Sequence, residues 1–127
     1  MRAEADRLAV VESIDSGKTL AEAQGDVAGS ARLFEYYAGA ADKLDGRSVN
    51  LGNGNAAFTL LELVGVTAHI VPWNYPFEVT INKVAQVLAT GNTTILKPAP
   101  DTPWNATRLG RIVAEKRPYI HAVGHCS

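Results

Sequence analysis

Hydrophobic residues recur at helical spacing through the first third of the chain. Within residues 27–44, five of them fall at offsets 0, 4, 7, 11 and 14 on one helical face: Val27, Ala31, Phe34, Ala38 and Ala41. Gly46 follows as a helix stop. The segment 3–18 predicts an earlier helix that ends in the letters DSGK. We therefore expect an N-terminal helical segment over residues 1–48.

After this segment the pattern changes to alternating strands and helices. Gly and Asn residues in NLGNGN predict a loop, and residues 56–63 predict a strand. The short, β-branched segment 65–71 predicts a buried strand, and residues 92–96 predict a second one that Lys97 closes. This order predicts a parallel strand–helix–strand–helix unit.

A helix is expected after each of these two strands. The first begins near Pro76, and its apolar face is formed by Phe77, Ile81, Val84, Ala85 and Leu88. The second covers 104–116, with Asp101 or Thr102 as N-cap and Pro103 at its first position. Its inward side chains are expected to be Leu109, Ile112 and Val113.

Composition narrows the class of protein. The chain has 127 residues, of which 46% are hydrophobic and 20% charged, as in a globular protein with one small domain. Twelve basic and thirteen acidic residues nearly cancel, so neither nucleic acid nor a membrane surface is an expected partner. The charged N-terminus, the absence of a long apolar run and the single cysteine, Cys126, predict a cytoplasmic protein.

Two proline-rich turns stand where the strands end. They are VPWNYP, residues 71–76, and KPAPDTP, residues 97–103. Ligands bind beyond the carboxyl ends of parallel strands, so the two turns should share one rim and hold side chains in fixed directions. The alternative is that they serve only as rigid connectors.

These turns carry a family resemblance. PWNYPF, EVTINKVAQVLATGN and TTILKPAPDTP resemble, in order and spacing, the cofactor domain of the aldehyde dehydrogenase superfamily, and the upstream ESIDSGKTLAEAQGDV and EYYAGAADKLDG are similar to its preceding helices. The resemblance covers residues 5–116. It implies an α/β fold, with a partial Rossmann-like NAD(P)-binding domain over 49–116 and a divergent tail over 117–127. It also implies oxidation of an aldehyde to a carboxylic acid with NAD or NADP.

The resemblance assigns the first turn to both the reaction and the cofactor. Asn74 matches the asparagine of the oxyanion hole, whose amide donates hydrogen bonds to the developing oxyanion. An Asx-type turn, in which Asn74 bonds only local backbone, is the alternative. The stretch that passes the cofactor in relatives is matched by Ile70, Val71, Pro72, Trp73 and Asn74. A strand end with a core tryptophan is compatible with the same residues.

The second turn is assigned to the cofactor. Lys97 matches a lysine that reaches the adenosine ribose hydroxyls, with Ala99 and Pro100 in the same turn. A solvated surface lysine is the ordinary alternative. Pro100 stands where many NAD-preferring members have a glutamate, so the choice between NAD and NADP stays open. Lys83 matches a lysine used in proton handling by some members, although a helical lysine is usually just solvated.

The family also requires a cysteine nucleophile, a glutamate base and a further glycine turn, which we do not find. Cys126 lies in VGHCS beside the terminus, where no oriented electropositive pocket is expected. His121, His125 and Cys126 have metal-ligand spacing, but we expect no metal site there. We therefore expect a truncated chain that is inactive alone.

Three functions follow from these features. By ancestry the chain is an oxidoreductase that acts on a small aldehyde. Alternatively, it is a non-catalytic remnant or docking module that associates with itself or with a full-length relative. The family oligomerises partly through an extra sheet, to which residues 56–63 could add a strand. A third possibility is a pseudogene product without stable function.

Overall fold

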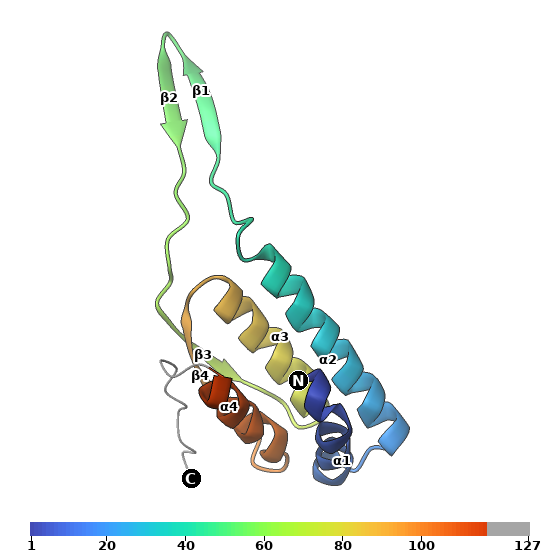
Figure 1. Cartoon of the computed structure of the whole chain (residues 1–127). Coiled ribbons are helices and arrows are strands. Elements are labelled where there is room, and N and C mark those ends of the chain that lie inside the picture. Colours follow the sequence, from blue (N-terminus) through green and yellow to red (C-terminus); the bar gives the residue numbers. More distant parts are fainter. Residues whose placement is uncertain (117–127) are drawn as a thin grey trace.

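The computed structural model describes residues 1–116, and its elements follow the expected order (Figure 1). They are a 3-10 turn (Arg2–Glu4), α1 (Ala5–Ser16), α2 (Leu20–Ala40), β1 (Ser48–Gly52), β2 (Asn55–Phe58), β3 (Val66–Ile70), α3 (Pro76–Ala89), β4 (Thr93–Lys97) and α4 (Trp104–Lys116). The N-terminal helices and the strand–helix–strand–helix unit are confirmed. The predicted tail, 117–127, lies outside the described residues.

Local chemistry explains how α1 and α2 meet. Gly17 ends α1 in a left-handed conformation with φ of 74°, and its N–H donates to the Ser13 carbonyl at 3.0 Å. α2 begins at Leu20 because Thr19 and Glu22 form a reciprocal capping box. The apolar stripe that starts at Val27 therefore covers only the later part of this helix. Gly25 sits within the added turns, where it adds no side chain to an apolar stripe.

The strands β3 and β4 form a parallel pair joined by α3. Their register pairs Val66 with Thr93 and Ile70 with Lys97. Alternate residues of β3 are exposed, and Val66 and Ile70 keep 68% and 80% of their surface. The expectation of a fully buried strand was wrong for the described residues, because helices cover one face of this pair and the other face is open.

The largest difference from expectation lies between α2 and β3. β1 and β2 form an antiparallel hairpin that projects away from the helices (Figure 1). The predicted loop therefore contains a strand, and the predicted strand 56–63 is shortened to Asn55–Phe58. Asn53 and Gly54 close the hairpin with φ of 50° and 76°, the two positive values that a type I′ turn requires.

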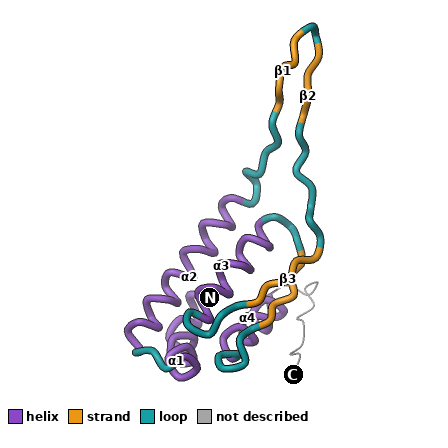
Figure 2. The backbone as a smooth tube through the Cα atoms, turned by 180° about the vertical axis from the view of Figure 1, so that it is seen from behind, coloured by secondary structure: helices purple, strands orange, loops and turns teal. Residues whose placement is uncertain are grey.

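One core joins the N-terminal helices to α3. Phe77 and Ile81 of α3 are fully buried against Leu8 of α1 and Val27 of α2. Leu109 of α4 is buried in the same cluster, and the partly buried Ile112 and Val113 pack against it, as predicted. Seen from behind, α3 lies beside α2 along its length (Figure 2).

Because this core spans both expected parts, the division at residue 48 remains a prediction. None of the described helices has the length and apolar character needed to cross a membrane.

Candidate functional site

Two turns leave the parallel pair from the same edge. Ile70, the last residue of β3, pairs with Lys97, the last residue of β4. The N–H of Val71 also donates to the Lys97 carbonyl at 3.1 Å. The turns 72–75 and 98–103 therefore begin side by side at the carboxyl ends of the strands, where ligands bind in sheets of this kind.

The first turn presents its polar and aromatic side chains to solvent. Val71 is buried at 2% exposure, whereas Pro72, Trp73 and Asn74 are exposed. Trp73 retains 61% of its surface, so it is not a core tryptophan. Within residues 1–116 the Asn74 carboxamide makes no hydrogen bond, so the alternative of a local Asx-type turn does not describe it.

The second turn is held mainly by its backbone. Lys97 is exposed, and its Nζ donates to the Pro98 carbonyl at 3.2 Å. Ala99 is half-buried and accepts a hydrogen bond from the N–H of Thr102 at 3.2 Å, while Pro100 is exposed. Lys97 and Asn74 are thus brought to one rim of the molecule. Lys83 is exposed on α3 and belongs to neither turn.

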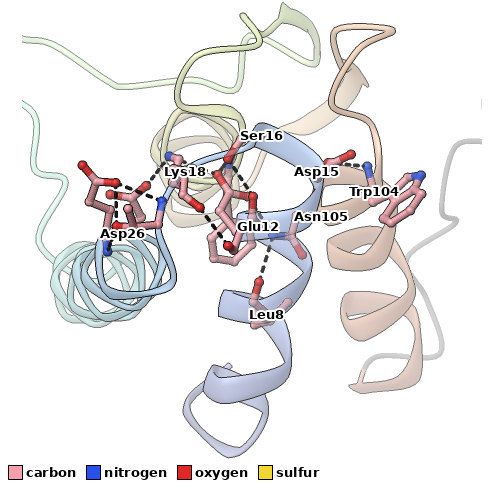
Figure 3. Close-up of polar contacts among 12 residues, drawn as sticks. Leu8, Glu12, Asp15, Ser16, Lys18, Asp26, Trp104 and Asn105 are labelled. Carbon is pink, nitrogen blue, oxygen red and sulfur yellow. Dashed lines mark hydrogen bonds and ion pairs between the residues drawn. The ribbon is translucent and has the colours of Figure 1, made fainter.

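The N-terminus of α4 is capped from a distant part of the chain. The N–H of Trp104 donates to Oδ2 of Asp15, at the end of α1, at 2.9 Å (Figure 3). Burial raises the pKa of Asp15, although hydrogen bonds from the backbone of Trp104 and Asn105 oppose that rise. The prediction of Asp101 or Thr102 as the N-cap of α4 was wrong. The side chain that accepts from the first N–H of α4 is Asp15, which belongs to α1 and not to the preceding turn.

A second carboxylate of α1 reaches the start of α3. Glu12 is fully buried, and its Oε1 accepts from the N–H of Phe77 at 3.4 Å. Its Oε2 accepts from Nδ2 of Asn105 at 2.7 Å (Figure 3). Sequence reasoning missed this group. The available signal was its position, because Leu8, Glu12 and Asp15 share one helical face with offsets of 4 and 7.

Lys18 connects this carboxylate to the first turn. Its Nζ lies 3.4 Å from Oε1 of Glu12 and is bonded to the carboxylate of Asp26. The same Nζ lies 4.7 Å from the ring centroid of Tyr75, a distance that favours a cation–π contact. Tyr75 directly follows Asn74, so the polar cluster of α1 extends to the residue beside the exposed amide.

The sequence model of the aldehyde dehydrogenase family matches residues 1–118. The chain belongs to the aldehyde dehydrogenase family. It is 47% identical to the hydroxyisobutyraldehyde dehydrogenase of Mycolicibacterium austroafricanum over 109 residues, which are 86% of this chain and 22% of that protein.

Solved structures of other proteins share its fold. PnpE from Pseudomonas sp. WBC-3, solved with nicotinamide adenine dinucleotide, superposes with a TM-score of 0.85 at 34% identity, over 90% of this chain and 24% of that one. The glyceraldehyde-3-phosphate dehydrogenase GapN of Methanocaldococcus jannaschii, solved with NADP, gives 0.85 at 26% identity, over 90% and 25%. These neighbours confirm the Rossmann-like α/β class.

The chain spans about a quarter of the length of these relatives. Among residues 1–116, no group of three or more His, Cys, Asp or Glu side chains could hold a metal ion. The histidines and the cysteine of the tail lie outside the described residues.

Proposed function

We propose that this chain contributes the oxyanion donor and part of the cofactor surface of an NAD(P)-dependent aldehyde dehydrogenase. The observation that carries the proposal is the register of β3 and β4, which starts the Asn74 turn and the Lys97 turn at one edge. In a family that oxidises aldehydes, an exposed amide donor at that edge can stabilise the oxyanion of a hemithioacetal.

The cofactor is assigned to the same edge. Lys97 can donate from its ammonium group to ribose hydroxyls, and the backbone from Ile70 to Asn74 offers a path without long charged side chains. Ala99 and Pro100 extend this surface. Solved relatives hold nicotinamide adenine dinucleotide in one case and NADP in another, and we propose that the cofactor here is one of these two. One cysteine in 127 residues fits a reducing compartment, and we place the function in the cytoplasm.

The test uses a full-length family member in which residues 1–116 of this chain replace the matching segment. Asn74→Ala in this chimera should lower kcat about a hundredfold, because one oxyanion donor is lost. Asn74→Asp should lower it at least as far, since the carboxylate keeps the size of the amide but cannot donate. Turnover is measured where acyl transfer limits the rate.

Asn82→Ala is the matched control. Its amide oxygen accepts a hydrogen bond from Gln86 within α3 at 2.6 Å, away from the turn. This variant should keep the kcat of the parent chimera. An Asn74→Ala enzyme that also keeps its kcat would refute the oxyanion role.

A second candidate function is association with another chain, either a second copy or a full-length relative. A specific observation favours it: the segment between β2 and β3 exposes Leu60, Leu61, Leu63 and Val64 at 84%, 66%, 64% and 81%. Exposed apolar side chains that follow one another along an extended segment mark contact surfaces. The mass of the chain in solution, measured by light scattering, tests this association.

A further inference from the structure

The C-terminal end of α1 contacts the starts of both helices that follow the site turns. Glu12 and Asp15 lie three residues apart and so share one side of α1. From this side Glu12 reaches Phe77 of α3, and both carboxylates reach α4 (Figure 3). α3 begins one residue after Tyr75, and α4 begins directly after Pro103.

We propose that Glu12 and Asp15 are positioning residues that fix the separation between the Asn74 turn and the Lys97 turn. The proposal rests on the function proposed above, because it gives these carboxylates a purpose only where the two turns act on one substrate and cofactor. Neither carboxylate touches the reacting atoms.

Glu12 is suited to this task because it is buried and both of its carboxylate oxygens have partners. Its two oxygens accept from Phe77 N–H, Asn105 Nδ2 and Lys18 Nζ at 3.4, 2.7 and 3.4 Å. Asn105 also donates to the Leu8 carbonyl at 3.2 Å, which fixes its amide against α1. A buried carboxylate with donors from α3 and α4 cannot shift without breaking a bond to one of them.

Of the two helices α3 and α4, Asp15 holds only α4. Its Oδ2 accepts from Trp104 N–H at 2.9 Å, in the first turn of α4, where the helix dipole also favours a negative group. Among the described residues, the Asp15 side chain makes no hydrogen bond to α3. The two carboxylates therefore differ in what they hold: Asp15 affects the turn of Lys97, whereas Glu12 affects both turns.

The turns need such external support. Trp73, Asn74 and Pro100 are exposed, and the Lys97 side chain bonds only its neighbouring Pro98 carbonyl among the described residues. Their positions therefore depend on the strand ends on one side and on the helix starts on the other. A displacement near 1 Å of a catalytic group can cost about a hundredfold in rate, so the anchoring of the helix starts matters.

The test compares Asp15→Ala with Asp15→Asn in the chimera. Asparagine keeps an oxygen that accepts from Trp104 N–H, whereas alanine removes it. Asp15→Ala should raise the KM for the cofactor roughly tenfold and leave kcat within about twofold, since only the Lys97 turn is released. Asp15→Asn should restore the parent KM. Asp6→Ala, an exposed position of the same helix, is the control.

Glu12→Gln extends the test to both turns. Phe77 N–H and Asn105 Nδ2 donate to different oxygens of Glu12, so in glutamine one of these two donors would face the new N–H₂ group. We expect kcat to fall and the cofactor KM to rise, each about tenfold. If Glu12→Gln fails to fold, the comparison of Asp15→Ala with Asp15→Asn still tests the inference.

The outcomes separate the two proposals. If Asp15→Ala matches Asp6→Ala, or if Asp15→Asn raises the cofactor KM as much as Asp15→Ala while both variants also lose Tm and kcat, the carboxylates are only structural and the inference is wrong. Asn74→Ala in the same chimera reports on the function itself. A loss of kcat there, with no KM change in Asp15→Ala, would remove the inference and keep the proposed function. An unchanged kcat there would remove the function, and with it the inference.

Discussion

The ammonium group of Lys18 pairs with two carboxylates and an aromatic ring. It contacts the carboxylates of Glu12 and Asp26 and the ring of Tyr75, and its side chain is only 12% exposed. Burial alone would lower the pKa of Lys18, but the hydrogen bond and charge of Asp26, together with those of Glu12, raise it. Folding therefore favours the protonated ammonium.

This gives a pH-dependent prediction for stability. The pKa of Lys18 is raised in the folded state. The contribution of Lys18 to the free energy of unfolding is therefore complete below the ordinary lysine pKa of about 10.4, and it is lost as the pH rises through the pKa of the folded state. Lys18→Met should lower the free energy of unfolding at pH 7 by about 1–3 kcal/mol, because Glu12 loses a donor. The gap between the two proteins should narrow above about pH 10.

Urea unfolding of the two proteins at several pH values measures this gap. Lys43→Met is the control, since Lys43 forms an exposed ion pair with Asp42. That pair should change stability by less than about 1 kcal/mol at any pH. A Lys18→Met gap that stays constant or widens in alkali would contradict the assignment.

At the residue scale, the sequence predicted which side chains lie in the two turns at the strand ends. Asn74 and Lys97 stand in short motifs beside the strand ends, and the strand order alone places them at one edge. Glu12 and Asp15 could not be assigned in this way, because the donors on α3 and α4 that they accept from lie 65 to 93 positions along the chain. No periodicity states which distant N–H group a buried carboxylate meets.

Among the elements, α3 follows its sequence pattern most closely. Its predicted apolar face is buried at Phe77, Ile81, Val84 and Ala85, and only Leu88 is exposed, at 37%. Ile81→Ala should lower the free energy of unfolding by about 2–5 kcal/mol, since it opens a cavity in the core. Leu88→Ala, on the same helix, should cost less. Urea denaturation followed by circular dichroism measures both, and equal losses would show that α3 does not pack as described.

The elements that sequence reasoning misplaced have local causes. α2 begins seven residues before Val27, the first residue of the predicted apolar stripe, because Thr19 and Glu22 cap it. The hairpin was mistaken for a loop because its Gly and Asn residues serve as a tight turn between short strands. β1 is exposed at every position, so no alternation of apolar and polar burial marks it.

On the scale of the whole molecule, buried and exposed apolar surfaces are segregated. Helices α1, α2, α3 and α4 share the core, whereas the hairpin, the segment that follows it and one face of the β3–β4 pair are open. The fold class was predictable because helices and parallel strands alternate in the sequence. The extent of the open surface was not predictable, because the covering of a strand depends on elements that are distant in the chain.

This segregation predicts that the 127-residue chain self-associates. Leu60 and Val64 are exposed at 84% and 81% in a segment where the described backbone has no strand partner, so burying them against a second copy is favourable. We expect light scattering to give a mass above one chain at micromolar concentration, together with binding of the dye ANS to apolar surface. Leu60→Ser with Val64→Ser should lower the mass and reduce dye binding. Leu20→Ser, at an exposed position of α2, is the control. A strictly monomeric parent chain without dye binding would contradict the association proposed above, because its apolar surface would then have no need of a partner.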